Sequence, residues 1–217
     1  YGLKVEKQKL KTVHEMSDKI IIRNQYSHRI STVKKSNGHS ILRIIAYINA
    51  RKLSNNLTGQ EHNFSNKSGV IETGFYMPHG IKTDMTEEQF YNHIENNSHA
   101  STNIIAYSSI AALPPELPPS EQVKLVEEFC NIFTDQYGTS ISFAIHEADN
   151  LMRKKAKLAE IEKYNLPVDD EDLRLQIQNN HVHFVIPYCK IEPMTEQDLK
   201  AKRKKKSFGD TFKLGNQ

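Results

Sequence analysis

The stretch HVHFVIPY at residues 181–188 constrains the fold of this chain more than any other feature. Its β-branched and aromatic residues predict a strand, and side chains along a strand point alternately to opposite faces. One face then carries Val182, Phe184 and Ile186, and the other carries His181, His183 and Val185. A buried imidazole needs partners for both of its nitrogens, and two neighbouring imidazoles double that requirement. A metal ion between the histidines would meet it, and solvation or hydrogen bonding is the alternative.

The length of the chain, 217 residues, is enough for one domain with a sizeable core. The sequence contains no run of 18 apolar residues and no signal-peptide pattern, so we expect a soluble, cytoplasmic protein without membrane insertion. Its two cysteines, Cys130 and Cys189, do not lie in a CxxC motif. A zinc knuckle and a disulfide scaffold are therefore not expected.

Positive charge is concentrated towards the two ends of the chain, although the net charge is only +3. Residues 1–60 hold 12 Lys and Arg against three acidic residues, a surplus of nine. The tail KAKRKKK (200–206) adds six positive charges, whereas acidic residues gather in VDDED (168–172). This asymmetry favours a polyanionic partner, and a set of solvated lysines is the alternative interpretation.

Hydrophobic periodicity and capping residues predict an α+β domain. Strands are expected at residues 25–33, 69–78, 103–113, 140–147 and 181–188, and helices at residues 40–53, 86–97, 120–137 and 151–164. Ser40 is the expected N-cap of the first helix. Thr86 and Gln89 predict a capping box at the second helix, and Gly138 ends the third. We expect the helices to pack on one side of the sheet.

His146, at the end of the strand 140–147, is a candidate third metal ligand. If the strands 140–147 and 181–188 are adjacent and antiparallel, His146 lies close to His181 and His183. Three neutral imidazoles leave coordination positions open, which is typical of a catalytic metal site rather than a structural one. A hydrogen-bonded histidine at the end of a strand is the alternative interpretation.

Tyr47 lies in the helical stretch RIIAYINAR between Arg43 and Arg51, which are four residues away on either side. The three side chains are expected on one helix face, where they could bind a phosphate; an ordinary exposed surface is the alternative. A phenol has a pKa near 10, so a nucleophilic tyrosine needs nearby positive charge or a base to ionise at neutral pH. Tyr26, in the preceding predicted strand, is the nearest competitor.

These segments together resemble the MobA/MobL relaxases of mobilisable and conjugative plasmids, which belong to the HUH endonuclease class. The resemblance covers roughly residues 24–190 and depends on the order of four segments. They are STVKKSNGHSILRIIAYINARKL, ALPPEL, SFAIHEAD and NNHVHFVIPY. The resemblance implies an antiparallel central sheet with flanking helices, and histidines on two central strands.

The resemblance assigns a role to each candidate residue. In this family the helix after a serine-rich turn carries the nucleophilic tyrosine, which maps to Tyr47. The family's I-H-D/E segment maps to residues 145–147 and its N-P-H-x-H strand to residues 179–183, so that His146, His181 and His183 form a metal triad. The implied cofactor is a divalent ion, Mg²⁺ or Mn²⁺, with Zn²⁺ as the alternative. The basic residues expected to contact DNA are Arg29, Lys34, Lys35, Arg43 and Arg51.

The chain departs from the family pattern at several positions. The family carries acidic residues just before its A-L-P segment, where this chain has Ser-Ser-Ile at residues 108–110. Asn180 replaces a proline, and the segment between His146 and His181 is long. The missing carboxylates leave the general base open, with Glu147 and Asp149 as stand-ins.

The resemblance implies site- and strand-specific nicking and rejoining of DNA at a plasmid transfer origin through a 5′-phosphotyrosyl intermediate. It also implies single-stranded DNA with an adjacent hairpin as the partner, and export from the bacterial cytoplasm with that DNA through a type IV secretion channel. Three alternatives stay open: a replication initiator of the same class, a degenerate relaxase that binds single-stranded DNA without cleaving it, and a small-molecule metalloenzyme. The predicted organisation is a basic extension at 1–23, a relaxase domain at 24–195 and a basic tail at 196–217 that can link to further domains.

Overall fold

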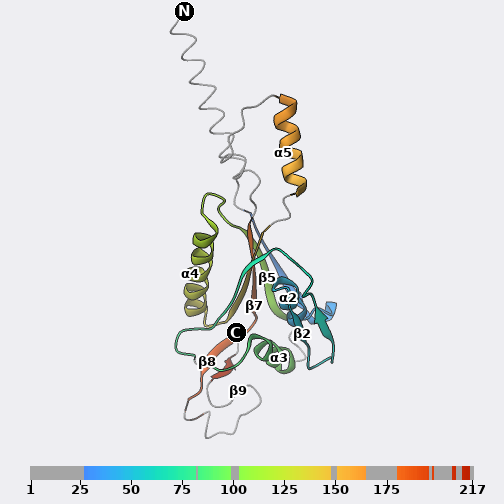
Figure 1. The fold of residues 1–217 in the computed structure, drawn as a ribbon. Helices are drawn as coiled ribbons and strands as arrows, with labels where there is room; N and C mark the ends of the chain where they lie inside the picture. Colours follow the sequence, from blue (N-terminus) through green and yellow to red (C-terminus); the bar gives the residue numbers. More distant parts are fainter. Residues whose placement is uncertain are drawn as a thin grey trace, which may run out of the picture.

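The computed structural model describes residues 27–81, 83–98, 103–147, 151–164, 180–195, 197, 207–208 and 212–215. The predicted extension at 1–23, the VDDED segment and the KAKRKKK tail lie outside the described residues, as do Tyr26 and Asp149. The architecture below is that of the described residues (Figure 1).

A five-stranded antiparallel sheet forms the centre of the fold (Figure 1). In spatial order its strands are β1 (His28–Lys34), β5 (Ile104–Ala112), β7 (His181–Pro187), β6 (Ile141–His146) and β4 (Val70–Tyr76). Every neighbouring pair is antiparallel, and each predicted strand corresponds to one of these five. The predicted α+β class, with an antiparallel central sheet and flanking helices, is confirmed.

Local capping signals fix where several helices begin and end. The helices are α2 (Ile41–Ile48), α3 (Glu87–Asn97), α4 (Pro119–Tyr137) and α5 (Leu151–Tyr164), with a 3-10 turn at Lys35–Asn37. The N–H of Arg43 donates to the Ser40 hydroxyl at 3.3 Å, and Thr86 and Gln89 form the predicted capping box of α3. Gly138 ends α4 with a φ of 62°, in the left-handed region that glycine adopts at little cost.

The histidine face, which we define as the face of the sheet from which His181 and His183 project, is covered by α2 and α3. Val185 lies on this face because it alternates with the same period as the two histidines. It packs in one core cluster with α2 and α3 residues that include Ile45, Phe90 and Ile94. The cover of α2 and α3 therefore determines what surrounds the histidines.

The opposite face of the sheet, which we call the α4 face, packs against α4 (Figure 1). Val182 and Phe143 share a second core cluster with Val126 and Cys130 of α4. The prediction that the helices pack on one side of the sheet is therefore wrong. The periodicity of a helix shows that it has an apolar stripe but does not show which sheet face that stripe covers.

Two smaller sheets lie outside the central one. A hairpin is formed by β2 (Lys52–Ser54) and β3 (Glu61–Asn63), and a three-stranded sheet by β8 (Lys190–Pro193), β9 (Ser207–Phe208) and β10 (Phe212–Gly215). Phe212 of β10 is fully buried in the cluster under the histidine face. The packed core thus includes a residue of the segment 196–217, which was predicted to be a basic tail. Among the described residues, no helix combines the length and apolar character that a membrane span requires.

Candidate active site

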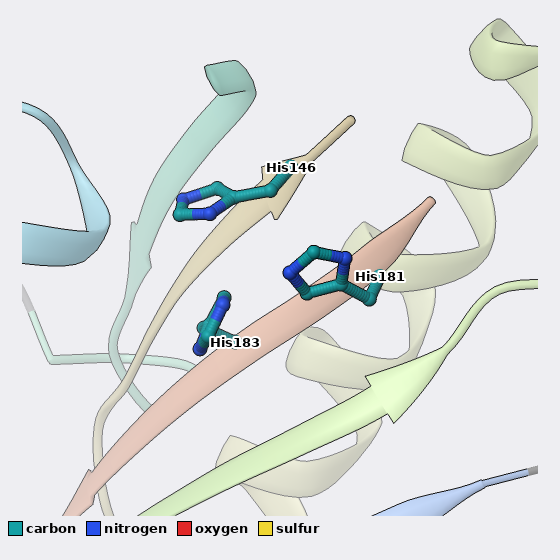
Figure 2. Close-up of side chains that lie close together, drawn as sticks. All are labelled: His146, His181 and His183. Atoms are coloured by element: carbon teal, nitrogen blue, oxygen red, sulfur yellow. The ribbon is translucent and has the colours of Figure 1, made fainter. Parts of the chain in front are cut away.

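Three histidines converge at one end of the central sheet (Figure 2). His146, at the end of β6, is directly opposite His181 of β7 in the antiparallel register, and His183 lies two residues further along β7. A ligand nitrogen from each ring lies within 4.8 Å of those of the other two. The ring centroids of His146 and His183 are 4.7 Å apart, and those of His181 and His183 are 5.0 Å apart. The predicted proximity of the three candidate ligands is confirmed.

Burial favours the neutral form of the His146 and His183 imidazoles. His146 is only 5% exposed, and burial lowers its pKa, an effect that a hydrogen bond to the Ile48 carbonyl partly opposes. The pKa of His183 is lowered to about 3, mainly by burial and further by the neighbouring His146, His181 and Lys67. A neutral imidazole keeps a lone pair on one nitrogen, which is the state that a metal ligand requires.

The hydrogen bonds of His146 define its tautomer. Its Nε2 lies 2.5 Å from the carbonyl oxygen of Ile48, and because a carbonyl only accepts, Nε2 must carry the proton. In a neutral ring Nδ1 then bears the lone pair. This nitrogen lies 3.3 Å from Nζ of Lys67, which donates to it.

Helix α2 carries Tyr47 next to this cluster. Ile41, Ile45 and Ile48 are buried, so the helix is anchored on the histidine face and its last turn directly contacts His146 through the Ile48 carbonyl. The Tyr47 side chain is 48% exposed, and its ring packs edge-on against Phe64 with centroids 5.4 Å apart. Tyr47, the predicted nucleophile, is therefore accessible, and it directly precedes Ile48, whose carbonyl bonds to the candidate ligand His146.

Lys67 connects Tyr47 with the histidines, and the sequence reasoning missed it. Its Nζ lies 3.9 Å from the centroid of the Tyr47 ring and 3.3 Å from the Tyr47 carbonyl oxygen. The same ammonium reaches His146 Nδ1, and burial lowers the pKa of Lys67. A cation held over an aromatic face is attracted by the negative face of the ring.

The position of Lys67 follows from strand pairing rather than from a local motif. Val70 of β4 is paired with His146, and the Gly69 carbonyl accepts from the N–H of Glu147 at 2.8 Å. Gly69 has a φ of 85°, which an L side chain rarely adopts. Lys67 lies three residues before Val70, so the pairing of β4 with β6 brings it beside His146. Lys67 belongs to none of the helices and strands that were predicted from the sequence.

Arg51 does not lie on the face of α2 that carries Tyr47, so that part of the sequence prediction is wrong. The helix ends at Ile48, and Ala50 has a φ of 50°, in the left-handed region that terminates helices. The guanidinium of Arg51 instead forms an ion pair with Glu87, whose pKa is raised by burial. The apolar spacing of α2 stops at Ile48, and this was the signal that could have placed the end of the helix correctly.

The other basic residues predicted to contact DNA are distributed over three elements. Arg43, one turn before Tyr47 in α2, and Arg29 of β1 are exposed, whereas Lys34 and Lys35 are half-buried. Lys35 Nζ donates to the backbone carbonyl of residue 98 at 2.9 Å. Their role in DNA binding stays a prediction.

Ile110 occupies the place beside the histidines where the family pattern leads one to expect acidic residues. Ile110 of β5 is directly opposite His183 on one side and Arg29 of β1 on the other. Residues that are directly opposite share a sheet face, so the three side chains form a row on the histidine face. Ile110 is 40% exposed and supplies no carboxylate to the site. Glu147, the stand-in next to His146, is exposed.

Asn180, which replaces the proline of the family strand, has a structural role at the start of β7. It is 4% exposed, and its amide donates to the buried Gln122 of α4 at 2.9 Å. Its carbonyl accepts from the N–H of Leu113 at 2.9 Å. These bonds fix the strand just before His181, so the departure is compatible with the geometry of the cluster.

The donor set fits a single divalent cation. Among the described residues, the group of His, Cys, Asp and Glu side chains that could share an ion is His146, His181 and His183. All three donors are imidazole nitrogens, which suit transition-metal ions better than Mg²⁺. Three protein ligands leave coordination positions open for a substrate.

The fold of the chain is similar to that of a solved structure described as "Molecular Basis of Vancomycin Resistance Transfer in Staphylococcus aureus". The TM-score is 0.58 over 80% of this chain and 74% of that chain, and because the sequence identity is 16%, the likeness concerns the fold alone. The protein therefore has the α+β architecture of that structure. It belongs to the MobA/MobL family, whose model matches residues 39–216.

Two curated relatives support this membership. "Mobilization protein MobL" of Acidithiobacillus ferridurans is 23% identical over 164 residues, which cover 74% of this chain and 42% of the relative. "Probable mobilization protein MobA" of Bifidobacterium longum is 22% identical over 123 residues, which cover 56% of this chain and 22% of the relative. The chain thus spans less than half the length of these relatives.

Proposed function

We propose that this domain is a relaxase that nicks and rejoins one DNA strand at a plasmid transfer origin through a covalent link to Tyr47. The observation that carries the proposal is the direct contact between the last turn of α2 and His146, one of three converging imidazoles. Tyr47 directly precedes Ile48 in that turn, and the centroid of its ring lies 3.9 Å from the Lys67 ammonium that also contacts His146. Membership of the MobA/MobL family supports the same function.

The proposed reaction exchanges one phosphodiester for another. The phenolic oxygen of Tyr47 attacks phosphorus, its proton is lost, the bond from phosphorus to the 3′-oxygen breaks, and that oxygen takes up a proton. The product is a 5′-phosphotyrosyl link with a free 3′-hydroxyl, and attack by that hydroxyl reverses the step. A divalent ion, for which the nitrogen donors favour Mn²⁺ over Mg²⁺, would supply Lewis-acid stabilisation of the phosphate oxygens.

The residues of the chain itself supply positioning and charge. The isoleucines that anchor α2 fix the backbone of Tyr47, which limits the positions that the phenol can take relative to the histidines. Arg29 and Arg43, both exposed, would contact the DNA backbone around the nick. A hairpin beside the nick, a secretion channel and passage from the cytoplasm with the DNA are further parts of this proposal.

A domain that binds DNA without cleaving it is the second candidate function. The observation that favours it is Ile110, which stands beside His183 and offers no carboxylate to act as a general base. The two functions differ in one product, because only the relaxase forms a bond between protein and DNA that survives denaturant.

The experiment is a covalent-adduct assay with Mn²⁺ and single-stranded oligonucleotides that tile the transfer region of the element encoding the chain. We expect the wild type and the control Tyr137→Phe, on α4, to form a denaturant-resistant adduct, and Tyr47→Phe to form none while still binding DNA. An adduct at wild-type level in Tyr47→Phe would show that the nucleophile is another residue. Binding without any adduct in the wild type would favour the binding-only function.

A further inference from the structure

Lys67 and a metal ion would need the same nitrogen of His146. Nε2 of that ring donates its proton to the Ile48 carbonyl at 2.5 Å, so Nδ1 is the nitrogen with a lone pair. Nζ of Lys67 donates to this lone pair at 3.3 Å. A lone pair binds one partner at a time, so an ion that coordinates Nδ1 must displace the ammonium.

Charge repulsion acts in the same direction as this competition. Imidazole ligands bring no negative charge to offset a divalent ion beside an ammonium. Lys67 is half-buried, so water screens the repulsion only in part. The lysine stem has four rotatable carbons, and its head can move while Tyr47 stays anchored by α2.

We propose that Lys67 is a positioning residue that exchanges with the metal: its ammonium holds His146 Nδ1 in the metal-free protein and moves to the DNA phosphate when a divalent ion takes that nitrogen. This proposal rests on the proposed relaxase function. The same ammonium lies over the Tyr47 ring. When the metal ion displaces it from His146, the ammonium becomes available to bind the phosphate next to the nucleophile. Metal binding and the electrostatics of the nucleophile are then coupled through one side chain.

Metal binding without DNA is the first test. We would titrate Mn²⁺ into the metal-free protein by calorimetry, with wild type, Lys67→Met, Lys67→Gln and Lys67→Arg. The control is Lys124→Met on the opposite sheet face, an exposed lysine paired with Glu121, which removes the same charge away from the site. We expect Mn²⁺ to bind about tenfold more tightly to both neutral variants, because they lose a competing hydrogen bond and a repulsive charge. Lys67→Arg and Lys124→Met should stay near the wild type.

The adduct rate at saturating Mn²⁺ is the second test. Lys67→Met should lower the maximal rate at which Tyr47 forms the adduct with the oligonucleotide found in the adduct assay. Lys67→Arg should restore part of that rate, because a guanidinium also binds phosphate. A purely structural role of Lys67 would lower the rate in both variants alike.

The outcomes separate this inference from the proposed function. Mn²⁺ affinity in Lys67→Met and Lys67→Gln no higher than in the wild type would overturn the exchange, even if the wild type forms the adduct normally. Tighter Mn²⁺ binding in the neutral variants, with no adduct in any protein, would support the exchange and reject the relaxase function.

Discussion

The two faces of the central sheet differ in kind, although neighbouring residues of one strand supply both. β7 presents His181, His183 and Val185 to the histidine face and Val182, Phe184 and Ile186 to the α4 face. The histidine face gathers imidazoles, Lys67 and Tyr47 where the cover of α2 ends. The α4 face holds a largely apolar groove of about 810 Å³ between α4 and strands β1, β5 and β7.

This difference teaches that candidate-site residues and core residues alternate along the part of β7 that carries the histidines. On the α4 face, side chains such as Val182 and Phe143 are buried in contact with other apolar groups, and they stabilise the fold by their removal from water. On the histidine face, the polar groups contact each other and the backbone of α2. Substitutions at adjacent positions of β7 should therefore have opposite effects.

The largest expected effect is that of His183→Ala. Loss of one imidazole of the proposed triad should weaken Mn²⁺ binding by more than about hundredfold and abolish the adduct, since even outer partners of metal ligands contribute 10–100-fold. Thermal unfolding should change little, because the ring is only half-buried. Calorimetry and circular dichroism measure the two effects, and undiminished Mn²⁺ affinity would remove His183 from the triad.

Val182→Ala, one residue away, should show the reverse. Val182 is 1% exposed, and the loss of two methyl groups from this core should cost about 1.5–2.5 kcal/mol in the free energy of unfolding. Mn²⁺ affinity at a temperature where the variant is folded should equal that of the wild type. Urea unfolding measures the expected loss in the free energy of unfolding. A Val182→Ala variant that is as stable as the wild type but binds Mn²⁺ weakly would show that the two faces are not independent.

The stability of the metal-free protein should depend on pH through the histidine face. The pKa of His183 is lowered to about 3 and that of His146 is also lowered, so the unfolded chain binds more protons below its histidine pKa of about 6.5. The contribution of these two histidines to the free energy of unfolding should thus be constant above that pH and fall as the pH drops, by at most about 1.4 kcal/mol per pH unit for each group. Urea unfolding in a chelator should show a weaker pH dependence in His183→Gln but not in Val182→Ala. Equal slopes in all three proteins would contradict the assignment.

The smallest expected effect concerns salt. Arg43 is exposed one turn before Tyr47, and if it contacts a phosphate, Arg43→Gln should reduce the slope of log K against log salt by about 0.7 for single-stranded DNA. Lys124→Gln, on the other side of the sheet, should leave the slope unchanged. Fluorescence anisotropy with a labelled oligonucleotide measures both. A flat plot for the wild type would reject electrostatic DNA binding altogether.

Strong local signals allowed much of the fold to be predicted. The capping box at Thr86 and Gln89, the stop at Gly138 and the alternation of β7 each depend on neighbouring residues, and all three were confirmed. The hairpin of β2 and β3 was missed because its strands have three residues each, too short to show an alternation. The face covered by α4 was assigned wrongly because periodicity does not distinguish the two faces of a sheet.

The candidate site could be predicted only for the residues that are part of a recognisable sequence pattern. The HxH pair and the strand-end position of His146 placed the cluster, and its convergence was confirmed. Lys67 has no such signal, since its place depends on the pairing of Val70 with His146, which are 76 residues apart in the numbering of the chain. Arg51 was misplaced because no glycine marks the end of the helix after Ile48, and the end of the apolar spacing there was overlooked.

Identification of the tyrosine that carries DNA tests the central claim most directly. The chain has nine tyrosines, and trypsin should release Tyr47 in the peptide IIAYINAR, between Arg43 and Arg51. After the adduct is trimmed with nuclease and digested, mass spectrometry should find the nucleotide remnant on this peptide alone. The same remnant on a peptide with any other tyrosine, such as NQYSHR with Tyr26, would contradict the account.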